Sequence, residues 1–161
     1  MQLSGWFRDG TPALPPRVTP APHEPAADLP RARHVLKHTF GFSDFLPVQA
    51  DVVARVLEGL DTLAVMPTGG GKSLCYQLPA LLFDGLTVVV SPLVALMQDQ
   101  VRQLHELGVA AAALNHMVPL SEYTAITSRV RRGELRILYL APETLLRPET
   151  LFLLEQSRLG W

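Results

Sequence analysis

The feature that most constrains the fold of this chain is a regular alternation of apolar runs and helix-like segments that begins near residue 62. Helical periodicity separates four continuous apolar runs, which have the pattern of strands buried on both faces. The predicted strands cover residues 62–67, 86–92, 109–115 and 135–142, and the predicted helices cover residues 72–82, 93–108, 121–132 and 143–156. Because parallel strands need crossover helices, this order predicts an α/β fold, a parallel sheet with flanking helices.

Upstream of this alternation the chain divides into two parts. Residues 1–30 contain seven of the fourteen prolines. Proline removes backbone donors and blocks helices, so we predict a disordered Pro-rich tail there, with a PxxP-type partner site as the alternative. The predicted domain, residues 31–161, begins with helical spacing over residues 32–41 and 46–60. His34 and His38 could chelate a metal ion, but no third ligand is near, and a solvated or core-edge pair is the simpler interpretation.

The composition narrows the functions open to the chain. A formal net charge of -1 gives no global basic field of the kind that marks a nucleic-acid binder, so any such binding must use local patches and backbone amides. Cys75 is the only cysteine, which excludes an intrachain disulfide and fits a reducing compartment. The first ten residues have no apolar signal core, and no apolar stretch is long enough to span a bilayer. We therefore expect a cytoplasmic protein.

The first predicted strand leads directly into a glycine loop, "MPTGGGKS" at residues 66–73. A strand, a glycine loop ending in Lys-Ser and a helix form the arrangement that binds phosphates. The glycines let several backbone N–H groups point at one anion, Lys72 would reach the terminal phosphates, and the Ser73 hydroxyl would ligate Mg²⁺. Met66 stands where the strict pattern has its first glycine, and a glycine-rich turn without a ligand is the alternative reading of the loop.

Other unusual residues follow later predicted strands. Ser-Pro at residues 91–92 and Ala-Pro-Glu at residues 141–143 come at strand ends, as does the loop after Pro67. In parallel sheets, ligands bind at the carboxyl ends of the strands. These positions predict one functional edge of the sheet.

Four segments, in this order along the chain, resemble the RecQ family of DNA helicases. "FGFSDFLPVQADVV" (residues 40–53) is similar to the family's adenine-reading motif, and "MPTGGGKSLCYQLPAL" (residues 66–81) to its first motif. "VVVSPLVALMQDQV" (residues 88–101) resembles the next motif, which touches single-stranded DNA, and "ILYLAPETLL" (residues 137–146) the following one. The resemblance implies a RecA-like domain of the P-loop NTPase type, from a 3'-5' DNA helicase of recombination and repair.

The resemblance also implies roles for individual residues, with ATP and Mg²⁺ as the cofactors. Gln49 and Phe42 would contact the adenine, Lys72 would be the catalytic lysine, and Ser73 would ligate the Mg²⁺ ion. The implied cofactor-binding residues of the loop are Thr68, Gly69, Gly70, Gly71, Lys72 and Ser73. Single-stranded or partly duplex DNA is the implied partner, and its implied contacts are Ser91, Pro92 and Leu93. Three positions are less cationic than the family pattern: Leu46, Gln98 and Thr144.

ATP hydrolysis would need further residues. A P-loop enzyme also uses an acidic residue that holds Mg²⁺ and a group that places the attacking water. The family takes both from a strand ending in Asp-Glu-Ala-His, and these 161 residues contain no Asp-Glu pair. We therefore expect an incomplete domain, truncated before this motif, that alone neither hydrolyses ATP nor unwinds DNA. Whether the chain is an enzyme stays open. A non-hydrolysing nucleotide- or DNA-binding module and a small-molecule P-loop kinase are the alternatives.

Overall fold

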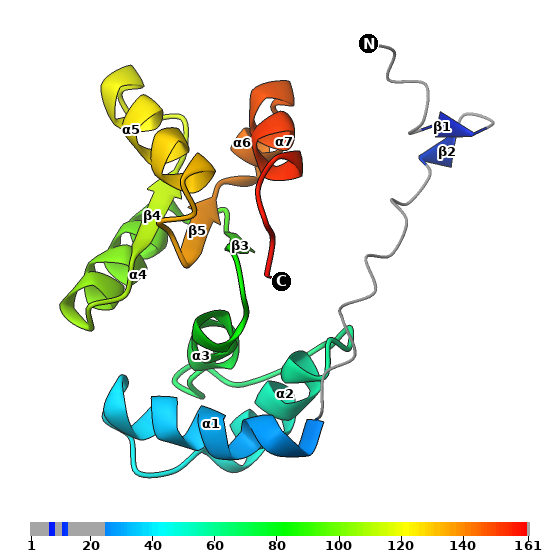
Figure 1. The fold of residues 1–161 in the computed structure, drawn as a ribbon, viewed down its shortest axis with the longest axis vertical. Coiled ribbons are helices and arrows are strands. Elements are labelled where there is room, and N and C mark those ends of the chain that lie inside the picture. Colours follow the sequence, from blue (N-terminus) through cyan, green and yellow to red (C-terminus); the bar gives the residue numbers. More distant parts are fainter. Residues whose placement is uncertain (1–6, 9–10, 13–24, 161) are drawn as a thin grey trace.

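Three parallel strands form the sheet of the structure, a computed structural model that describes residues 7–8, 11–12 and 25–160 (Figure 1). β3 (Thr87–Val90), β4 (Ala111–Leu114) and β5 (Ile137–Leu140) pair in the order β3-β5-β4, so the last of them in the sequence is central. Every residue of β5 is buried, as expected of a strand covered on both faces. The predicted α/β fold with a parallel sheet is confirmed.

Helices cover both faces of this sheet. α4 (Val94–Glu106) connects β3 to β4, α5 (Leu120–Arg131) connects β4 to β5, and α6 (Pro142–Leu145) and α7 (Pro148–Glu155) follow β5. One face packs against α5 and α7 through a cluster that includes Leu114, Leu138, Leu140, Ile126, Val130 and Leu153. The opposite face packs against α4 and α3 through Ile137, Tyr139, Met97, Leu104 and Ala80.

α3 (Leu74–Leu82) joins the sheet to a layer of two further helices, α1 (Pro25–His38) and α2 (Pro47–Leu57) (Figure 1). Leu74 and Leu78 lie four residues apart on one side of α3 and are buried against α1 and α2. Ala80, on another side, is buried against the sheet. The helix that directly follows the glycine loop is therefore fixed from two sides.

The predicted strand over residues 62–67 is wrong. These residues form no strand, and the side chains of Leu63 and Val65 are 91% and 88% exposed. A buried strand needs partners for its backbone groups. Residues 158–160 meet the chain just before β3, where Leu86 donates its N–H to the carbonyl of Arg158 (2.8 Å) and accepts from the N–H of Gly160 (2.9 Å). Apolar composition alone therefore misassigned residues 62–67.

Proline accounts for two smaller differences. The helix predicted over residues 143–156 is divided into α6 and α7, because Arg147 precedes Pro148 and is extended (φ -71°, ψ 136°). Residues 25–30, predicted to belong to the disordered tail, are the first turns of α1, and Pro25 stands at the helix start, where proline is tolerated.

Part of the predicted tail is also described. β1 (Phe7–Arg8) and β2 (Thr11–Pro12) pair antiparallel there, and the rest of that prediction lies outside the described residues. In the described part of the chain, no helix has the length and apolar character needed to cross a membrane.

Candidate nucleotide and DNA site

The glycine loop is built to present backbone N–H groups. Gly69 and Gly71 have φ values of 81° and 71°, which favour glycine, and the Gly70 N–H donates to the Pro67 carbonyl at 3.1 Å. Within the described residues, the N–H groups of Gly71, Lys72 and Ser73 donate to no protein atom. α3 begins directly after them, at Leu74, and adds the positive end of its dipole. Such an arrangement suits an anion.

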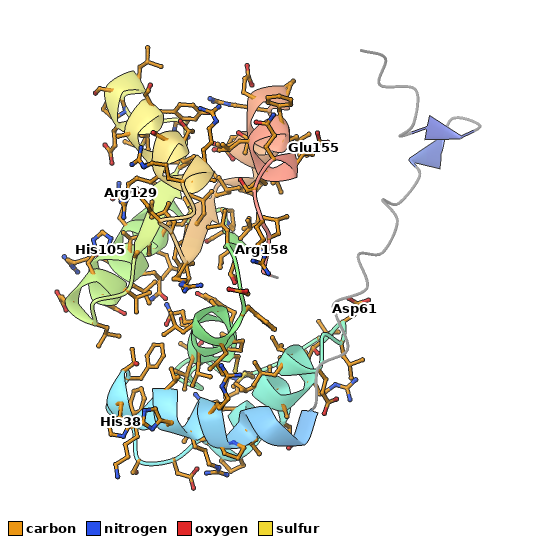
Figure 2. All side chains as sticks on the ribbon, viewed as in Figure 1. His38, Asp61, His105, Arg129, Glu155 and Arg158 are labelled. Atoms are coloured by element: carbon orange, nitrogen blue, oxygen red, sulfur yellow. The ribbon has the colours of Figure 1, made fainter. Side chains whose placement is uncertain are left out.

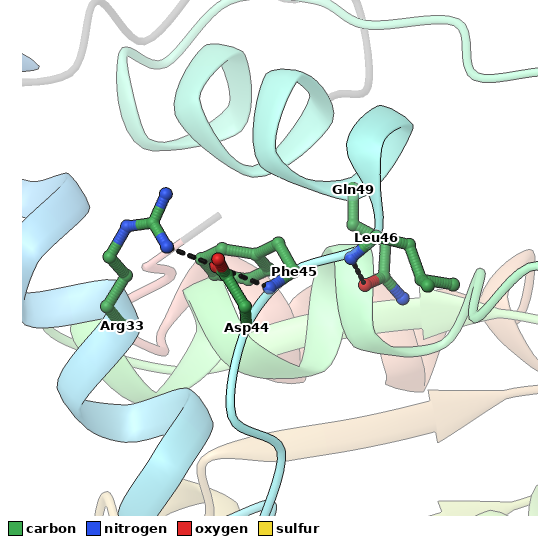
Figure 3. Close-up of polar contacts among 5 residues, drawn as sticks. All are labelled: Arg33, Asp44, Phe45, Leu46 and Gln49. Atoms are coloured by element: carbon green, nitrogen blue, oxygen red, sulfur yellow. Dashed lines mark hydrogen bonds and ion pairs between the residues drawn. The ribbon is translucent and has the colours of Figure 1, made fainter.

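Gln49 ties this loop to the start of α2. Its Oε1 accepts from the N–H of Leu46 at 2.9 Å (Figure 3), and its Nε2 donates to the carbonyl of Gly71 at 3.1 Å. The side chain is 4% exposed, so these bonds are shielded from water. A Cβ at Gly71 would lie 2.0 Å from Gln49 Nε2, which excludes any other residue without a shift. Gln49 is thus a loop support, a role that the sequence did not indicate.

A pocket of about 430 Å³ opens between the loop and the segment before α2. It brings five of the predicted cofactor-binding residues together: Phe42, Gln49, Gly69, Gly71 and Ser73. Leu46, one of the three less cationic positions, lies in the same wall and is half-exposed, so it presents an apolar side chain to the pocket. The predicted residues that do not line the pocket are Thr68, Gly70 and Lys72.

Lys72 lies folded against the loop itself. Its Nζ donates to the carbonyls of Met66 and Pro67, each at 2.9 Å, and the contacts are exposed to solvent. Met66, in the position of the missing glycine, packs beside Val52, Val56 and Cys75. The loop start is therefore held by apolar packing and by two bonds from the lysine.

An ion pair fixes the segment that carries Phe42. Arg33 on α1 pairs with Asp44, whose carboxylate also accepts from the N–H of Phe45 at 2.8 Å (Figure 3). The Phe45 N–H and the Arg33 guanidinium lower the pKa of Asp44. The same guanidinium lies 5.7 Å from the centre of the Phe45 ring, a cation–π contact. Asp44 lines the pocket but is held ionised by partners outside it.

The predicted DNA contacts lie at the carboxyl end of the sheet. Ser91 donates its N–H to the carbonyl of Leu140 at 3.0 Å, which aligns the ends of β3 and β5. Its Oγ accepts from the N–H of Leu93 at 3.3 Å, so the hydroxyl also caps the turn before α4. Pro92 and Leu93 are exposed. These residues share the edge of the sheet but do not line the nucleotide pocket.

A residue that sequence reasoning missed lies at this same edge. His116 follows β4, and its Nδ1 lies 3.2 Å from Oε1 of Glu143, which follows β5. The N–H of Glu143 itself and the His116 ring lower the pKa of this carboxyl. Its place directly after a predicted strand was the available signal. Thr144, beside Glu143, is fully buried and cannot reach a nucleic acid.

A larger groove of about 900 Å³ between α4, β4 and α5 contains none of the predicted site residues. Arg129 and His105, labelled in Figure 2, line it together with Gln98, which is exposed and is one of the three less cationic positions. His105 Nε2 lies 2.8 Å from the carbonyl oxygen of Ala111. The described residues contain no cluster of three or more metal-ligating side chains, here or at His34 and His38.

The comparisons with known proteins agree with this geometry. The DEAD/DEAH box helicase family matches residues 46–158, more than half of the chain. The ATP-dependent DNA helicase RecQ of Haemophilus influenzae is 44% identical over 131 residues, which are 81% of this chain and 21% of that protein.

Two other relatives give the same picture. The probable ATP-dependent DNA helicase RecS of Bacillus subtilis is 44% identical over 124 residues, 76% of this chain and 25% of its own length. The ATP-dependent DNA helicase Q5 of Mus musculus is 47% identical over 117 residues, 70% of this chain and 12% of its own length. The chain thus spans a quarter or less of these relatives. It belongs to the DEAD/DEAH box helicase family, and the resemblance to RecQ helicases inferred from its motifs is confirmed.

Proposed function

We propose that the chain is the part of a RecQ-like 3'-5' DNA helicase that binds Mg-ATP and single-stranded DNA, in recombination and repair. The observation that carries the proposal is the pocket beside the glycine loop. It lies between an apolar wall with Phe42 and the glycine loop, where Gly71 and Ser73 line the pocket and donate their N–H groups to no described protein atom. An anion and an aromatic base in one ligand would satisfy both halves.

The loop residues would hold the phosphates. Three N–H groups and the dipole of α3 would bind the anion, and the exposed Lys72 would exchange the carbonyls of Met66 and Pro67 for a terminal phosphate. Ser73, at the pocket wall, would be the protein's ligand to a phosphate-bound Mg²⁺. Bound ATP would supply the phosphoanhydride bond whose cleavage drives unwinding.

The base would lie against Phe42 and Leu46. Gln49 donates one amide hydrogen to Gly71 and accepts from Leu46 with one lone pair, so one amide hydrogen and one lone pair remain for the edge of an adenine. Its contribution to base choice would therefore be small, about 1 kcal/mol for a net hydrogen bond. Its larger role would be to hold the loop.

The DNA strand would cross the carboxyl edge of the sheet. Pro92 and Leu93 offer exposed apolar contacts there, and the free N–H groups that open α4 offer a phosphate site. His116 would add a further donor at this edge, since it lies beside Glu143 and is exposed to solvent.

Hydrolysis would need more than these residues supply. Within the described residues no cluster of carboxylates stands ready for a metal ion, and the sequence contains no Asp-Glu pair. We therefore propose that the chain alone binds ATP without motor-like turnover. We also propose a cytoplasmic setting, which the single buried thiol of Cys75 supports.

The test is a titration with a fluorescent ATP analogue and Mg²⁺. Lys72→Ala should weaken binding at least about tenfold, because it removes a charge-assisted bond of about 1.5–3 kcal/mol. Lys37→Ala is the matched control, since Lys37 is the other lysine of the chain and lies exposed on α1. Equal affinities of both variants would refute the phosphate site.

A second measurement separates the alternatives. Labelled single-stranded oligonucleotides should bind the chain, and ATP turnover should stay at background with and without DNA. Phosphate transfer to a small acceptor would instead identify a kinase. Turnover that DNA accelerates and Lys72→Ala abolishes would show that a carboxylate such as Glu143 serves the metal ion.

A further inference from the structure

A buried polar cluster crosses the apolar layer between α3 and the sheet. Gln77 on α3 donates from Nε2 to Gln100 Oε1 on α4 at 2.7 Å and to the Tyr139 hydroxyl on β5 at 3.1 Å. Tyr76 donates its hydroxyl to the same Gln100 oxygen at 3.5 Å. Gln77, Gln100 and Tyr139 are 7%, 8% and 1% exposed. Three elements far apart in the sequence are thus joined by side-chain hydrogen bonds.

The chemistry of this cluster fixes its geometry. Both hydrogens of the Gln77 amide are used, one on each partner, so the amide plane has one orientation that satisfies them. Burial raises the pKa of Tyr139 above its usual value of 10.0, so its hydroxyl stays neutral. Tyr139 is 1% exposed and lies among apolar residues, so a hydrogen bond that its hydroxyl loses is not replaced by one to water. A small movement of α3 must therefore be followed by α4 and β5, or bonds are lost.

The three elements are those that carry the candidate site. Gln77 lines the pocket and donates its N–H to the carbonyl of Ser73 in the loop at 3.0 Å. Gln100 lies on α4, which begins after Ser91–Leu93. Tyr139 lies in β5, which leads to Glu143. The cluster is thus a polar contact that joins the helix after the loop, the helix after the candidate DNA edge and the central strand of the sheet.

We propose that Gln77, Gln100 and Tyr139 form a positioning cluster that couples the phosphate loop to the DNA-contacting edge of the sheet. The ligands in this inference rest on the proposed function, but the coupling of the two regions belongs to the protein itself. Anion binding at the loop pulls on the first turn of α3, and Gln77 passes that displacement to α4 and β5. ATP at the loop therefore changes the affinity of the edge for DNA, and by linkage DNA at the edge changes the affinity of the loop for ATP by the same factor.

The first test needs no ligand. Tyr139→Phe removes one hydroxyl and keeps the ring, and Tyr123→Phe on α5 is the matched control, because Tyr123 is half-buried in the cluster on the other face. In ¹⁵N-labelled chains, Tyr139→Phe should move the backbone amide signals of both Gly71 and Ser91, and Tyr123→Phe should move neither. Because the Ser91 N–H donates directly to the Leu140 carbonyl of β5, the Gly71 signal decides the test, and an unmoved Gly71 signal would overturn the proposal.

The second test measures the linkage. In the unchanged chain, saturating single-stranded DNA should change the dissociation constant of Mg-ATP by about fivefold or more. Tyr139→Phe and Gln100→Met should each reduce that factor to below about twofold, and the double variant should reduce it no further, because both break one network. A linkage that survives both substitutions would overturn the inference. If the unchanged chain binds neither ligand, the proposed function fails, and the amide signals alone decide the coupling.

Discussion

Gly71→Ala should damage the fold far more than Gly69→Ala, although the two glycines stand two residues apart in one loop. Both have a positive φ, which costs an alanine about 1–2 kcal/mol. A Cβ at Gly69 meets nothing within 4 Å, whereas a Cβ at Gly71 would lie 2.0 Å from Gln49 Nε2 and 3.2 Å from its Cδ. The Gln49 side chain would have to leave its place.

The extra cost follows from the bonds that Gln49 makes. Its displacement removes the contacts to Leu46 and Gly71, each worth about 1 kcal/mol net. We expect Gly71→Ala to lower the free energy of unfolding by about 3–4 kcal/mol, against about 1–2 kcal/mol for Gly69→Ala. Urea denaturation followed by circular dichroism measures both values.

A double variant isolates the effect of the clash between a Cβ at residue 71 and the Gln49 side chain. In a chain that already carries Gln49→Ala, the added Gly71→Ala should cost only the backbone term of about 1–2 kcal/mol, because the obstructing amide is gone. Equal costs of Gly71→Ala with and without Gln49 would refute the argument, as would equal effects of the two glycine substitutions in the unchanged background.

Three further predictions concern the surface. Leu93→Asp should weaken oligonucleotide binding in an anisotropy titration. Leu151→Asp makes the same change at another exposed leucine, on α7, and should leave binding unchanged; equal losses of affinity would show that Leu93 does not contact the DNA. We expect the chain to self-associate through the nearly fully exposed apolar side chains of Leu63 and Val65, and Leu63→Lys with Val65→Lys should lower the mass measured by light scattering; an unchanged mass would contradict this expectation. The pKa of Glu143 should lie below its usual value of 4.5, so the stability that the carboxylate contributes is present above pH 4.5 and is lost as the pH falls through the lowered pKa. NMR titration of the Glu143 carboxyl measures this pKa. His116→Gln should remove only part of the lowering, since the N–H of Glu143 is the larger cause, and an unlowered pKa in the unchanged chain would contradict the prediction.

The sequence predicted those elements whose signals are local. β3, β4 and β5 lie inside the predicted runs, and α4 and α5 agree with their predicted bounds within a few residues, because period and composition are properties of one segment. Residues 62–67 have the same apolar composition as these strands. The strand prediction was wrong there because a strand needs a pairing partner elsewhere in the chain, and the composition of one segment does not identify that partner.

The features of the candidate site also differ in whether one segment of the sequence reveals them. The candidate phosphate loop could be proposed from its glycines, Lys72 and Ser73, all within one short segment. The support of the loop by Gln49 joins residues 22 apart, and the contact of His116 with Glu143 joins residues 27 apart. Neither pair has a pattern that a single segment reveals. Pro148, in contrast, was a visible signal for the break between α6 and α7.

The strand order also has a consequence for how the chain acquires its structure. β3 and β4 do not pair with each other. Both pair with β5, in which Ile137 lies opposite Thr87 of β3 and opposite Ala111 of β4. During synthesis on the ribosome, neither early strand can find its neighbour until residues 137–140 have emerged. Such late, long-range pairing is slow and leaves apolar edges open to other nascent chains. A chaperone that holds the growing polypeptide would therefore act on this protein chiefly in the interval before β5 is made.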